Sequence, residues 1–367
     1  MKILLFLCRL FVGVLFLISG FVKVIDPKGT AIKLEEYFDI FAQDFAPFFA
    51  YFIPAALFFS YAMIVLELVI GVALLINYKM KVTTWALLIL IVTFTFLTFY
   101  SYHFNVVTDC GCFGDAIKLT PKESFYKDII LLIPTLLLFV YRKKMYPLFV
   151  DKLGHTVIFV SFVGFALFAN YNVSHLPVID FRAYKIGTDL AKEKIGTPPV
   201  TAYFFTNKKT KEEKSFTEWP QLDSTWEYKD FKEIEPYKPA PLEEFVLKDP
   251  TGTDYTEELL NEEQVLLATL TKATDHSSIK EIDKLLLEAA KKSMKTVYVY
   301  SFGEEEFQSF QTTHLLSYDL ALQLDATVSK AMIRSNPGLV YLEKGIVKGK
   351  WHRNHLPNNI SEITTSK

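Results

Sequence analysis

Five long apolar segments in the first half of the chain constrain its fold more than any other feature. They cover residues 3–24, 53–76, 82–102, 125–141 and 155–170. Each approaches the ~20 residues that an α-helix needs to cross the hydrocarbon core of a membrane. The whole chain of 367 residues is 51% hydrophobic and contains 33 Phe, which is typical of membrane proteins. The pattern predicts a bundle of five transmembrane helices.

Basic residues in two short turns predict the orientation of this bundle. NYKMK (77–81) follows the second segment and YRKKM (141–145) follows the fourth. Short loops rich in Lys and Arg stay on the cytoplasmic side. We therefore expect a bacterial inner-membrane protein with a cytoplasmic N-terminus. The loop after the third segment and the whole C-terminal half then lie on the periplasmic side.

The loop between the first two segments, residues 24–52, mixes charged residues with Phe and Tyr. Such a pattern fits a helix that lies in the membrane interface. It fits equally well a loop that carries a belt of aromatic residues, and the sequence leaves both alternatives open.

The stretch TDCGCFGD (108–115) holds two of the three cysteines, Cys110 and Cys112, on either side of Gly111. A disulfide requires Cα atoms about 4.4–6.8 Å apart, which residues i and i+2 reach only in a bent conformation that a glycine permits. The ring would be small and strained, and strained, exposed disulfides are the labile or catalytic ones. Since closing so short a loop stabilises a fold little, a redox role is favoured over a structural staple.

A metal site at this loop is a weaker interpretation. Two thiolates need further ligands, and the surroundings add only His103, Asp109 and Asp115. The two aspartates would disfavour a thiolate, which fits a weak reductant or a pair that mainly accepts electrons. Cys8, the third cysteine, is interpreted as a small apolar helix residue on the far side of the membrane, so a partner must complete the electron path.

Charged residues inside membrane segments are costly and are usually paired or functional. Arg9 lies in the first segment and Glu67 in the second, and we expect them to pair, with Asp128 and Lys127 at the start of the fourth segment. A buried ion pair that fixes helix packing is the favoured interpretation. A proton path or a small-ligand site is the alternative. We expect Lys23 to extend to the membrane interface.

The C-terminal half has a different pattern. Residues 173–240 read as a linker with strands around a basic–acidic turn, TAYFFTNKKTKEEKSFTEW. Within residues 241–367, strands and helices alternate, which predicts a layered α/β domain. A first strand begins at FVLKD (245–249). The clearest elements are the strands QVLLATLT and TVYVYSF, the amphipathic helix SIKEIDKLLLEAAKKS between them, and the hairpin SNPGLVYLEKGIVKGKW.

Three stretches together resemble the DoxX/MauE group of four-helix membrane proteins. They are RLFVGVLFLISGFVKVIDPKGT (9–30), ELVIGVALLI (67–76) and DCGCFGD (109–115), and the resemblance covers residues 1–145. It implies a role in periplasmic thiol–disulfide chemistry. Residues 146–172 would add a fifth transmembrane helix to that four-helix core.

Residues 241–367 resemble a thioredoxin-like domain. The NPG sequence before the hairpin stands where that fold has its cis-proline, and the order of strands and helices before it agrees. The departure is KATDHSS (272–278), which contains no cysteine where the redox motif of the fold would stand. Catalytic thiols therefore cannot be assigned to this domain. The whole arrangement resembles DoxX-family proteins of Bacteroidota. Arg334 and Asn336, beside Pro337, would shape an edge that binds a partner chain.

The sequence thus favours a membrane component of periplasmic thiol–disulfide exchange. Cys110 and Cys112 would be its redox pair, and its soluble domain would dock a periplasmic or membrane protein. The alternative is a non-enzymatic envelope scaffold with a redox-inactive thioredoxin-like domain; a weaker one is a transporter or small-lipid binder using Glu67 and Arg9. No residue pattern indicates a cofactor, although a quinone would be compatible. The net charge of −2 gives no sign of nucleic-acid binding, and membrane lipid is the other expected partner.

Overall fold

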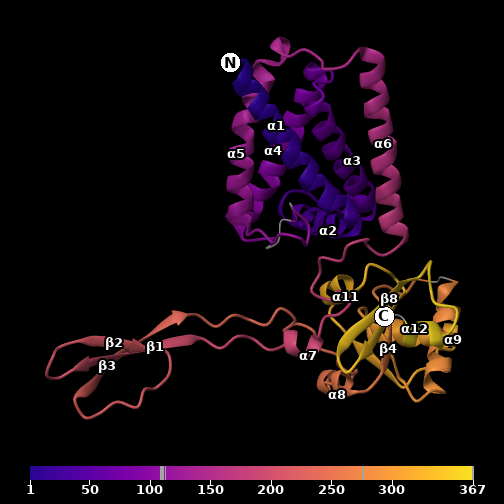
Figure 1. The fold of residues 1–367 in the computed structure, drawn as a ribbon. Coiled ribbons are helices and arrows are strands. Elements are labelled where there is room, and N and C mark those ends of the chain that lie inside the picture. Colours follow the sequence, from indigo (N-terminus) through magenta and orange to yellow (C-terminus); the bar gives the residue numbers. More distant parts are fainter. Residues whose placement is uncertain (108–110, 112, 275–276, 366–367) are drawn as a thin grey trace. The chain divides into compact units, whose positions relative to one another are not determined.

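The chain forms two compact units, Met1–Arg182 and Ala183–Lys367. The computed structural model describes all residues except 108–110, 112, 275–276 and 366–367. The first unit is helical and the second is mixed α/β (Figure 1).

The first unit is a bundle of helices. They are α1 (Lys2–Ile25), α2 (Pro27–Asp44), the 3-10 helix η1 (Pro47–Ala55), α3 (Ala56–Leu75), α4 (Met80–Phe104), α5 (Pro121–Val140), the 3-10 helix η2 (Arg142–Lys144) and α6 (Asp151–Ser174). Each of the five apolar segments is helical, so the sequence predicted these elements. The interval between the first two segments contains a helix, α2. It begins after Asp26, whose side chain accepts a hydrogen bond from the backbone of Gly29.

Four helical segments are long and apolar enough to cross a membrane: α1, the continuous run Pro47–Leu75, α4 and α6. Among the described residues, the first half of the chain thus holds four candidate membrane helices, one fewer than the sequence predicted. The fourth apolar segment forms α5, but the first two turns of this helix carry Glu123, Lys127 and Asp128. These charges lower its hydropathy, although its C-terminal half is as apolar as the other helices.

Small residues allow α1 and α3 to pack closely. A Cβ atom at Gly20 would lie 2.7 Å from Cγ of Leu68, and one at Gly71 would lie 2.9 Å from Cγ of Leu17. Membrane helices that lack a hydrophobic driving force associate through such close contacts. The Gly20–Leu68 contact sets the offset between the two helices, and this offset decides which polar residues of α1 and α3 face each other.

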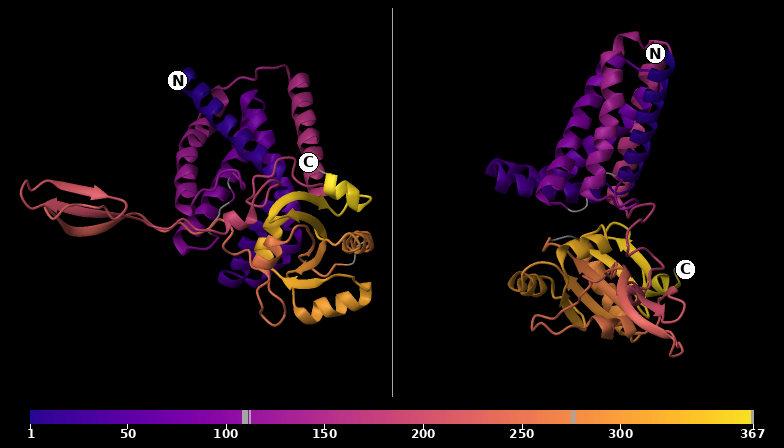
Figure 2. Two further views of the ribbon diagram at one scale, coloured as in Figure 1. Left: turned by 60° about the horizontal axis from the view of Figure 1, so that its bottom comes forward. Right: turned by 90° about the vertical axis from the view of Figure 1, so that its left-hand side faces the viewer.

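The second unit contains a five-stranded and a separate three-stranded sheet (Figure 2). Its elements are α7 (Leu190–Glu193), β1 (Val200–Asn207), β2 (Glu213–Phe216), β3 (Trp226–Glu235), α8 (Thr256–Asn261), β4 (Val265–Leu270), α9 (Ser278–Ala290), β5 (Lys295–Tyr300), α10 (Glu304–His314), β6 (Leu320–Gln323), α11 (Ala326–Met332), β7 (Gly338–Glu343), β8 (Ile346–His352) and α12 (Ile360–Thr365).

The five-stranded sheet has the order β6-β5-β4-β7-β8. β4 is parallel to β5 and antiparallel to β7, so the sheet is mixed. The helices α9, α10 and α12 share one apolar core with β4, β5 and β7. The predicted alternation of strand and helix is confirmed here. The face of α9 that the sequence predicted to be apolar is buried: Ile279, Ile282, Leu285, Leu286 and Ala289.

Two local predictions in the second unit differ from the structure. The predicted strand at 245–249 is wrong, because Lys248 forms only isolated bridges and Asp249 begins a turn by accepting backbone hydrogen bonds from Thr251 and Thr253. The three-stranded sheet has one strand more than predicted. Its added strand, β3, is almost entirely exposed, so it lacks the apolar alternation by which strands are predicted.

Candidate functional site

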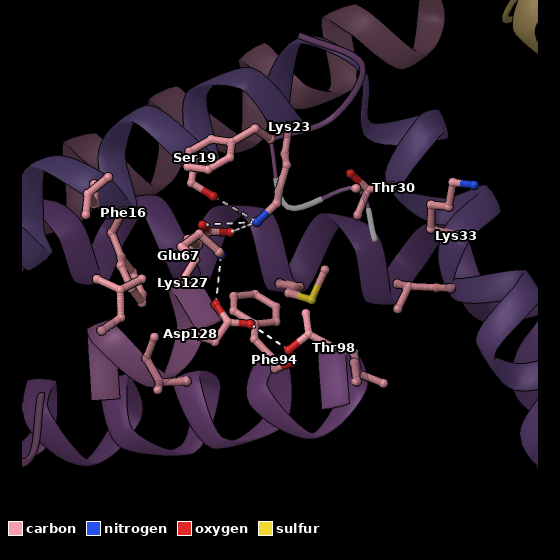
Figure 3. Close-up of a pocket in the computed structure, with 18 of the residues that line it drawn as sticks. Phe16, Ser19, Lys23, Thr30, Lys33, Glu67, Phe94, Thr98, Lys127 and Asp128 are labelled. Carbon is pink, nitrogen blue, oxygen red and sulfur yellow. Dashed lines mark hydrogen bonds and ion pairs between the residues drawn. The ribbon is translucent and has the colours of Figure 1, made fainter. Parts of the chain in front are cut away.

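A small cavity lies inside the helical bundle and is lined by residues of α1 to α5 (Figure 3). The cavity has a volume of about 60 Å³, enough for a few water molecules. Its polar lining residues are Ser19, Lys23, Thr30, Lys33, Tyr37, Glu67, Thr98, Lys127 and Asp128. Two pairs of opposite charge therefore line one cavity, together with further polar and apolar side chains.

The first pair joins α1 to α3. Lys23 Nζ lies 2.8 Å and 3.1 Å from the two carboxylate oxygens of Glu67, and it donates a third hydrogen bond to Ser19 at 3.1 Å. The two side chains are only 5% and 2% exposed. The ammonium also lies 4.8 Å from the ring centre of Phe94. Both charges are thus buried and neutralise each other. The prediction that Lys23 extends to the membrane interface is wrong.

Arg9 is not the partner of Glu67, so that predicted pair is also wrong. Arg9 stands 14 residues before Lys23 on α1, about 21 Å away at the rise of an α-helix. The Gly20–Leu68 contact places Glu67 level with Lys23 instead. Arg9 is buried as well. Its Nη1 has no hydrogen-bond partner among the described residues, and its guanidinium lies 5.5 Å from the ring centre of Phe6.

The second pair lies on α5. Asp128 is fully buried, and its Oδ2 accepts a hydrogen bond from Thr98 Oγ1 of α4 at 2.9 Å. Lys127 Nζ lies 2.7 Å from Oδ1 in an ion pair that lacks hydrogen-bond geometry. The sequence predicted both residues at the start of this helix. The structure brings Asp128 and Glu67 to one cavity, whereas Arg9 does not line it.

The predicted redox residues Cys110 and Cys112 lie outside the described residues. Gly111, which stands between them in sequence, is described and lines the same cavity. Its φ of +62° is in the left-handed region that favours glycine. The backbone N–H of Gly114, also at positive φ, donates to the carbonyl of Gly111 at 3.0 Å. The centre of the motif therefore forms part of a tight turn at the cavity.

Two cations stand beside this turn. A Cβ atom at Gly111 would lie 3.4 Å from Cγ of Lys33 on α2. Lys127 Nζ lies 5.6 Å from the ring centre of Phe113. Each of these lysines also lies against a carboxylate, Lys33 against Glu36 at 3.2 Å and Lys127 against Asp128 at 2.7 Å. The sequence analysis did not identify Lys33 as a site residue. The pattern of residues 24–52 does not indicate which other segment this part of the chain contacts.

The spacing of residues on α1 could have shown that Lys23 faces the interior of the bundle. The buried positions of that helix recur every three or four residues, as they do on one face of a helix. Lys23 follows Ser19 and Gly20 on that stripe, so the period places it in the bundle rather than in the interface.

The predicted partner-binding residues of the second unit use their polar groups inside the fold. Asn336 accepts a hydrogen bond from the backbone of Thr271 at 2.9 Å and donates to Thr274 Oγ1 at 2.7 Å. Arg334 donates to the carbonyl of Lys330 at 2.6 Å, and Pro337 is buried after a cis peptide bond. Asn336 thereby holds the loop that follows β4. A docking role for these residues stays a prediction.

Comparison with known proteins finds a family match and a distant relative. Residues 1–141 match the family described as methylamine utilisation protein MauE. Protein TlpB of Flavobacterium psychrophilum is 28% identical over 144 residues, which are 37% of this chain and 36% of that relative. The match thus spans about a third of the relative's length. The MauE match includes α1 to α5 and every residue that lines the cavity. The family match therefore coincides with the helical region that forms the cavity.

Proposed function

We propose that the protein takes part in thiol–disulfide exchange at a bacterial inner membrane, with Cys110 and Cys112 as its redox pair. One observation carries the proposal: Gly111, between the two cysteines, lines a cavity that also contains the buried Lys23–Glu67 pair and Asp128. Charged side chains buried in a membrane region are costly, and they often mark a functional site. A motif that can exchange electrons and protons beside such charges is in a suitable place for redox chemistry.

The chemistry follows from the turn and its cations. In the reduced state, a thiolate of the pair attacks a disulfide of a partner protein, and the second thiol resolves the mixed disulfide. The partner's disulfide gains two electrons and two protons, and the pair forms a disulfide; the reverse reaction oxidises the partner. Lys33 and Lys127 support the attacking thiolate. The bent backbone at Gly111 supports the small ring of the oxidised state.

The volume of the first cavity limits the size of the molecule that it can hold. Pockets that bind drug-sized ligands or cofactors measure about 300–1,000 Å³, whereas this cavity measures about 60 Å³. A few water molecules fit it and a quinone ring does not. Electron transfer would then run through a partner protein at the motif, and the cavity would supply hydration and charge.

In the proposed topology α5 also crosses the membrane. Its one fully buried charge, Asp128, is paired and hydrogen-bonded inside the bundle, which reduces the cost of insertion. Together with the four candidate spans this gives five, with the N-terminus in the cytoplasm. The loop with the cysteines and the second unit then share the periplasmic side.

The second unit would dock the partner. Its strand order, β6-β5-β4-β7-β8 with β4 parallel to β5, supports a thioredoxin-like domain. The segment after β4 has no cysteine, so the domain would bind rather than react. This absence also favours the alternative function, an envelope scaffold in which the cysteine pair never changes state.

Trapping thiols in growing cells separates these two functions. A Cys8→Ser variant leaves only Cys110 and Cys112, and a maleimide mass tag added after acid quenching counts reduced thiols on a gel. We expect the tagged fraction to change when the cells meet an oxidant or a reductant, and to recover afterwards. A Cys110→Ser variant in the same background should accumulate a mixed disulfide with the partner. A pair that stays in one state throughout would leave the scaffold as the function.

The lysines beside the motif provide an independent check. In the purified, reduced protein, Lys33→Gln and Lys127→Gln should each slow alkylation of the motif cysteines several-fold at neutral pH, since each removes a charge that favours the thiolate. Because Lys127→Gln also removes the ion-pair partner of the buried Asp128, its thermal unfolding is measured in parallel and alkylation is compared well below its melting temperature. Lys118→Gln is the matched control, because Lys118 is an exposed lysine of the loop between α4 and α5 that contains the cysteine motif. Equal rates in all three variants would remove the lysines from the proposed mechanism.

A further inference from the structure

A second, larger cavity lies at the end of the bundle where α4 and α6 begin. It measures about 400 Å³, which is within the range of ligand-binding pockets. Its walls are the turn between α3 and α4, the connection between α5 and α6, and the first turns of α4 and α6. The same end of the bundle contains the start of α1 (Figure 1). This cavity shares no lining residue with the first.

The charges of this cavity are unbalanced. Four cations line it, Lys79, Lys81, Arg142 and Lys143, against one carboxylate, Asp151. Within the described part of the chain, none of the four cations forms an ion pair with a carboxylate. Arg142 lies over the ring of Phe139, 4.0 Å from its centre, which holds the guanidinium in place. The cavity therefore attracts an anion.

Two helix N-termini add to this attraction. α4 is 25 residues long and α6 is 24, and neither has a side chain that caps its first turn. Free backbone N–H groups and the helix dipole favour negative charge at such ends. Lys79 and Lys81 belong to the start of α4, and Asp151 belongs to the first turn of α6, so the N-terminus of α4 carries more of the positive charge at this cavity.

Hydrogen bonds within the chain hold the walls of the cavity together. Asn77 Nδ2 donates to the carbonyl of Tyr146, and the backbone N–H of Leu148 donates to the carbonyl of Ile76 at 3.2 Å. These bonds tie the α3–α4 turn to the α5–α6 connection. A site formed in advance binds without the cost of ordering its loops.

Its rim is apolar. Tyr78, Met80, Met145 and Phe149 line the cavity beside the cations. Val82, which also lines it, is 66% exposed, and Leu148 and Val150 next to lining residues are 59% and 74% exposed. Exposed aliphatic side chains beside a basic pocket at the end of membrane helices match a ligand with a charged head and a hydrocarbon tail. A free phosphate would use the cations but not this rim.

We propose that this cavity binds the headgroup of an anionic phospholipid, with the phosphate on Lys79, Lys81, Arg142 and Lys143 and the acyl chains along the exposed aliphatic residues. The site is separate from the cysteine motif and holds whether or not that motif is redox-active.

The test uses the full-length protein, purified in a neutral detergent and freed of lipid. Native mass spectrometry and thermal unfolding are measured with phosphatidylglycerol, with phosphatidylcholine of identical acyl chains, and with inorganic phosphate. We expect phosphatidylglycerol to bind at least tenfold more tightly than phosphatidylcholine and to raise the melting temperature. Inorganic phosphate alone should stabilise the protein less than phosphatidylglycerol does.

The variant Lys79→Gln/Lys81→Gln/Arg142→Gln/Lys143→Gln should lose the preference for phosphatidylglycerol. A triple variant that keeps Arg142 serves if the contact with Phe139 is needed for folding. The matched control changes four exposed lysines of the β1–β2 hairpin to Gln: Lys208, Lys209, Lys211 and Lys214. It removes the same charge and should bind like the unmodified protein.

Three results would overturn the proposal. The first is equal affinity for the two lipids. The second is an unchanged preference for phosphatidylglycerol in the cavity variants. The third is stabilisation by inorganic phosphate alone that equals stabilisation by phosphatidylglycerol, because the cavity would then be a phosphate site without need of a lipid.

Discussion

The two cavities of the first unit are both lined by lysines, but the charges of these lysines are neutralised by carboxylates only in the first cavity. In the first, Lys23 and Lys127 each lie within 3 Å of a buried carboxylate. In the second, four cations face a single carboxylate and make no ion pair with any described residue. In the first cavity, carboxylates of the chain neutralise the charges of the lysines. In the second, the excess positive charge is neutralised only when an anion binds.

This difference has a physical consequence for stability. A buried charge that loses its partner stays in a low-dielectric environment without compensation, which is strongly unfavourable. An exposed or half-exposed cation that is removed costs the fold little. Substitutions in the first cavity should therefore affect folding, and substitutions in the second should affect binding.

Removal of the carboxylate of Glu67 should have the largest effect. In Glu67→Gln the ammonium of Lys23 stays buried without a counter-charge, and we expect a loss of about 3–5 kcal/mol. The measurement is thermal or denaturant-induced unfolding in detergent. Glu36→Gln breaks a partly exposed pair with Lys33 and should cost less than about 1 kcal/mol.

The double variant Lys23→Met/Glu67→Met is compared with its two single variants, Lys23→Met and Glu67→Met. It removes both charges, so it should be more stable than either single variant. If Glu67→Gln unfolds no more easily than Glu36→Gln, the first pair is not buried as described and the contrast between the cavities is lost.

Gly20→Ala tests the helix contact that aligns the first pair. The new methyl group would stand 2.7 Å from Leu68 Cγ, so α1 and α3 must move apart. We expect a loss of about 1–3 kcal/mol from overpacking. Gly164 on α6 has no atom within 4 Å of an added Cβ, and Gly164→Ala should be neutral or slightly stabilising. Equal stability of the two variants would contradict the close packing of α1 on α3.

Gly111→Ala tests the turn that brings the cysteine motif to the first cavity. At a φ of +62° a side chain costs about 1–2 kcal/mol. We expect a small loss of stability and a changed rate of cysteine alkylation. Gly303→Ala is the control, since Gly303 has a φ of −62° and open space around it. An unchanged alkylation rate would show that the turn does not set the reactivity of the thiols.

The four-cation variant of the second cavity should have the smallest effect on folding. Without lipid its free energy of unfolding should stay within about 0.5 kcal/mol of the unmodified protein. A slight gain is expected from reduced repulsion between like charges. A large loss in lipid-free detergent, measured by the same unfolding experiment, would show that the cations stabilise the bundle directly.

Much of the fold could be predicted because its signals are local. Runs of about 20 apolar residues identified the long apolar helices of the bundle but left α2 open between a helix and a loop, and period-3.6 spacing identified α9 and its buried face. Elements without such a signal were missed: β3 is exposed on nearly every residue, and β6 is only 4 residues long. The charges Glu67 and Asp128 were found because charge is rare in apolar segments.

The amino-acid sequence by itself determined the membrane helices, the alternating second unit and the presence of buried charges, since each depends on neighbours within a few residues. Only the tertiary structure decided that Glu67 pairs with Lys23 rather than Arg9, that Gly111 stands at the same cavity, and that two basic turns and two helix N-termini enclose a second one. These facts depend on the offset between packed helices. Contacts such as Gly20 against Leu68 set that offset through steric fit between residues far apart in the chain, which no local pattern records.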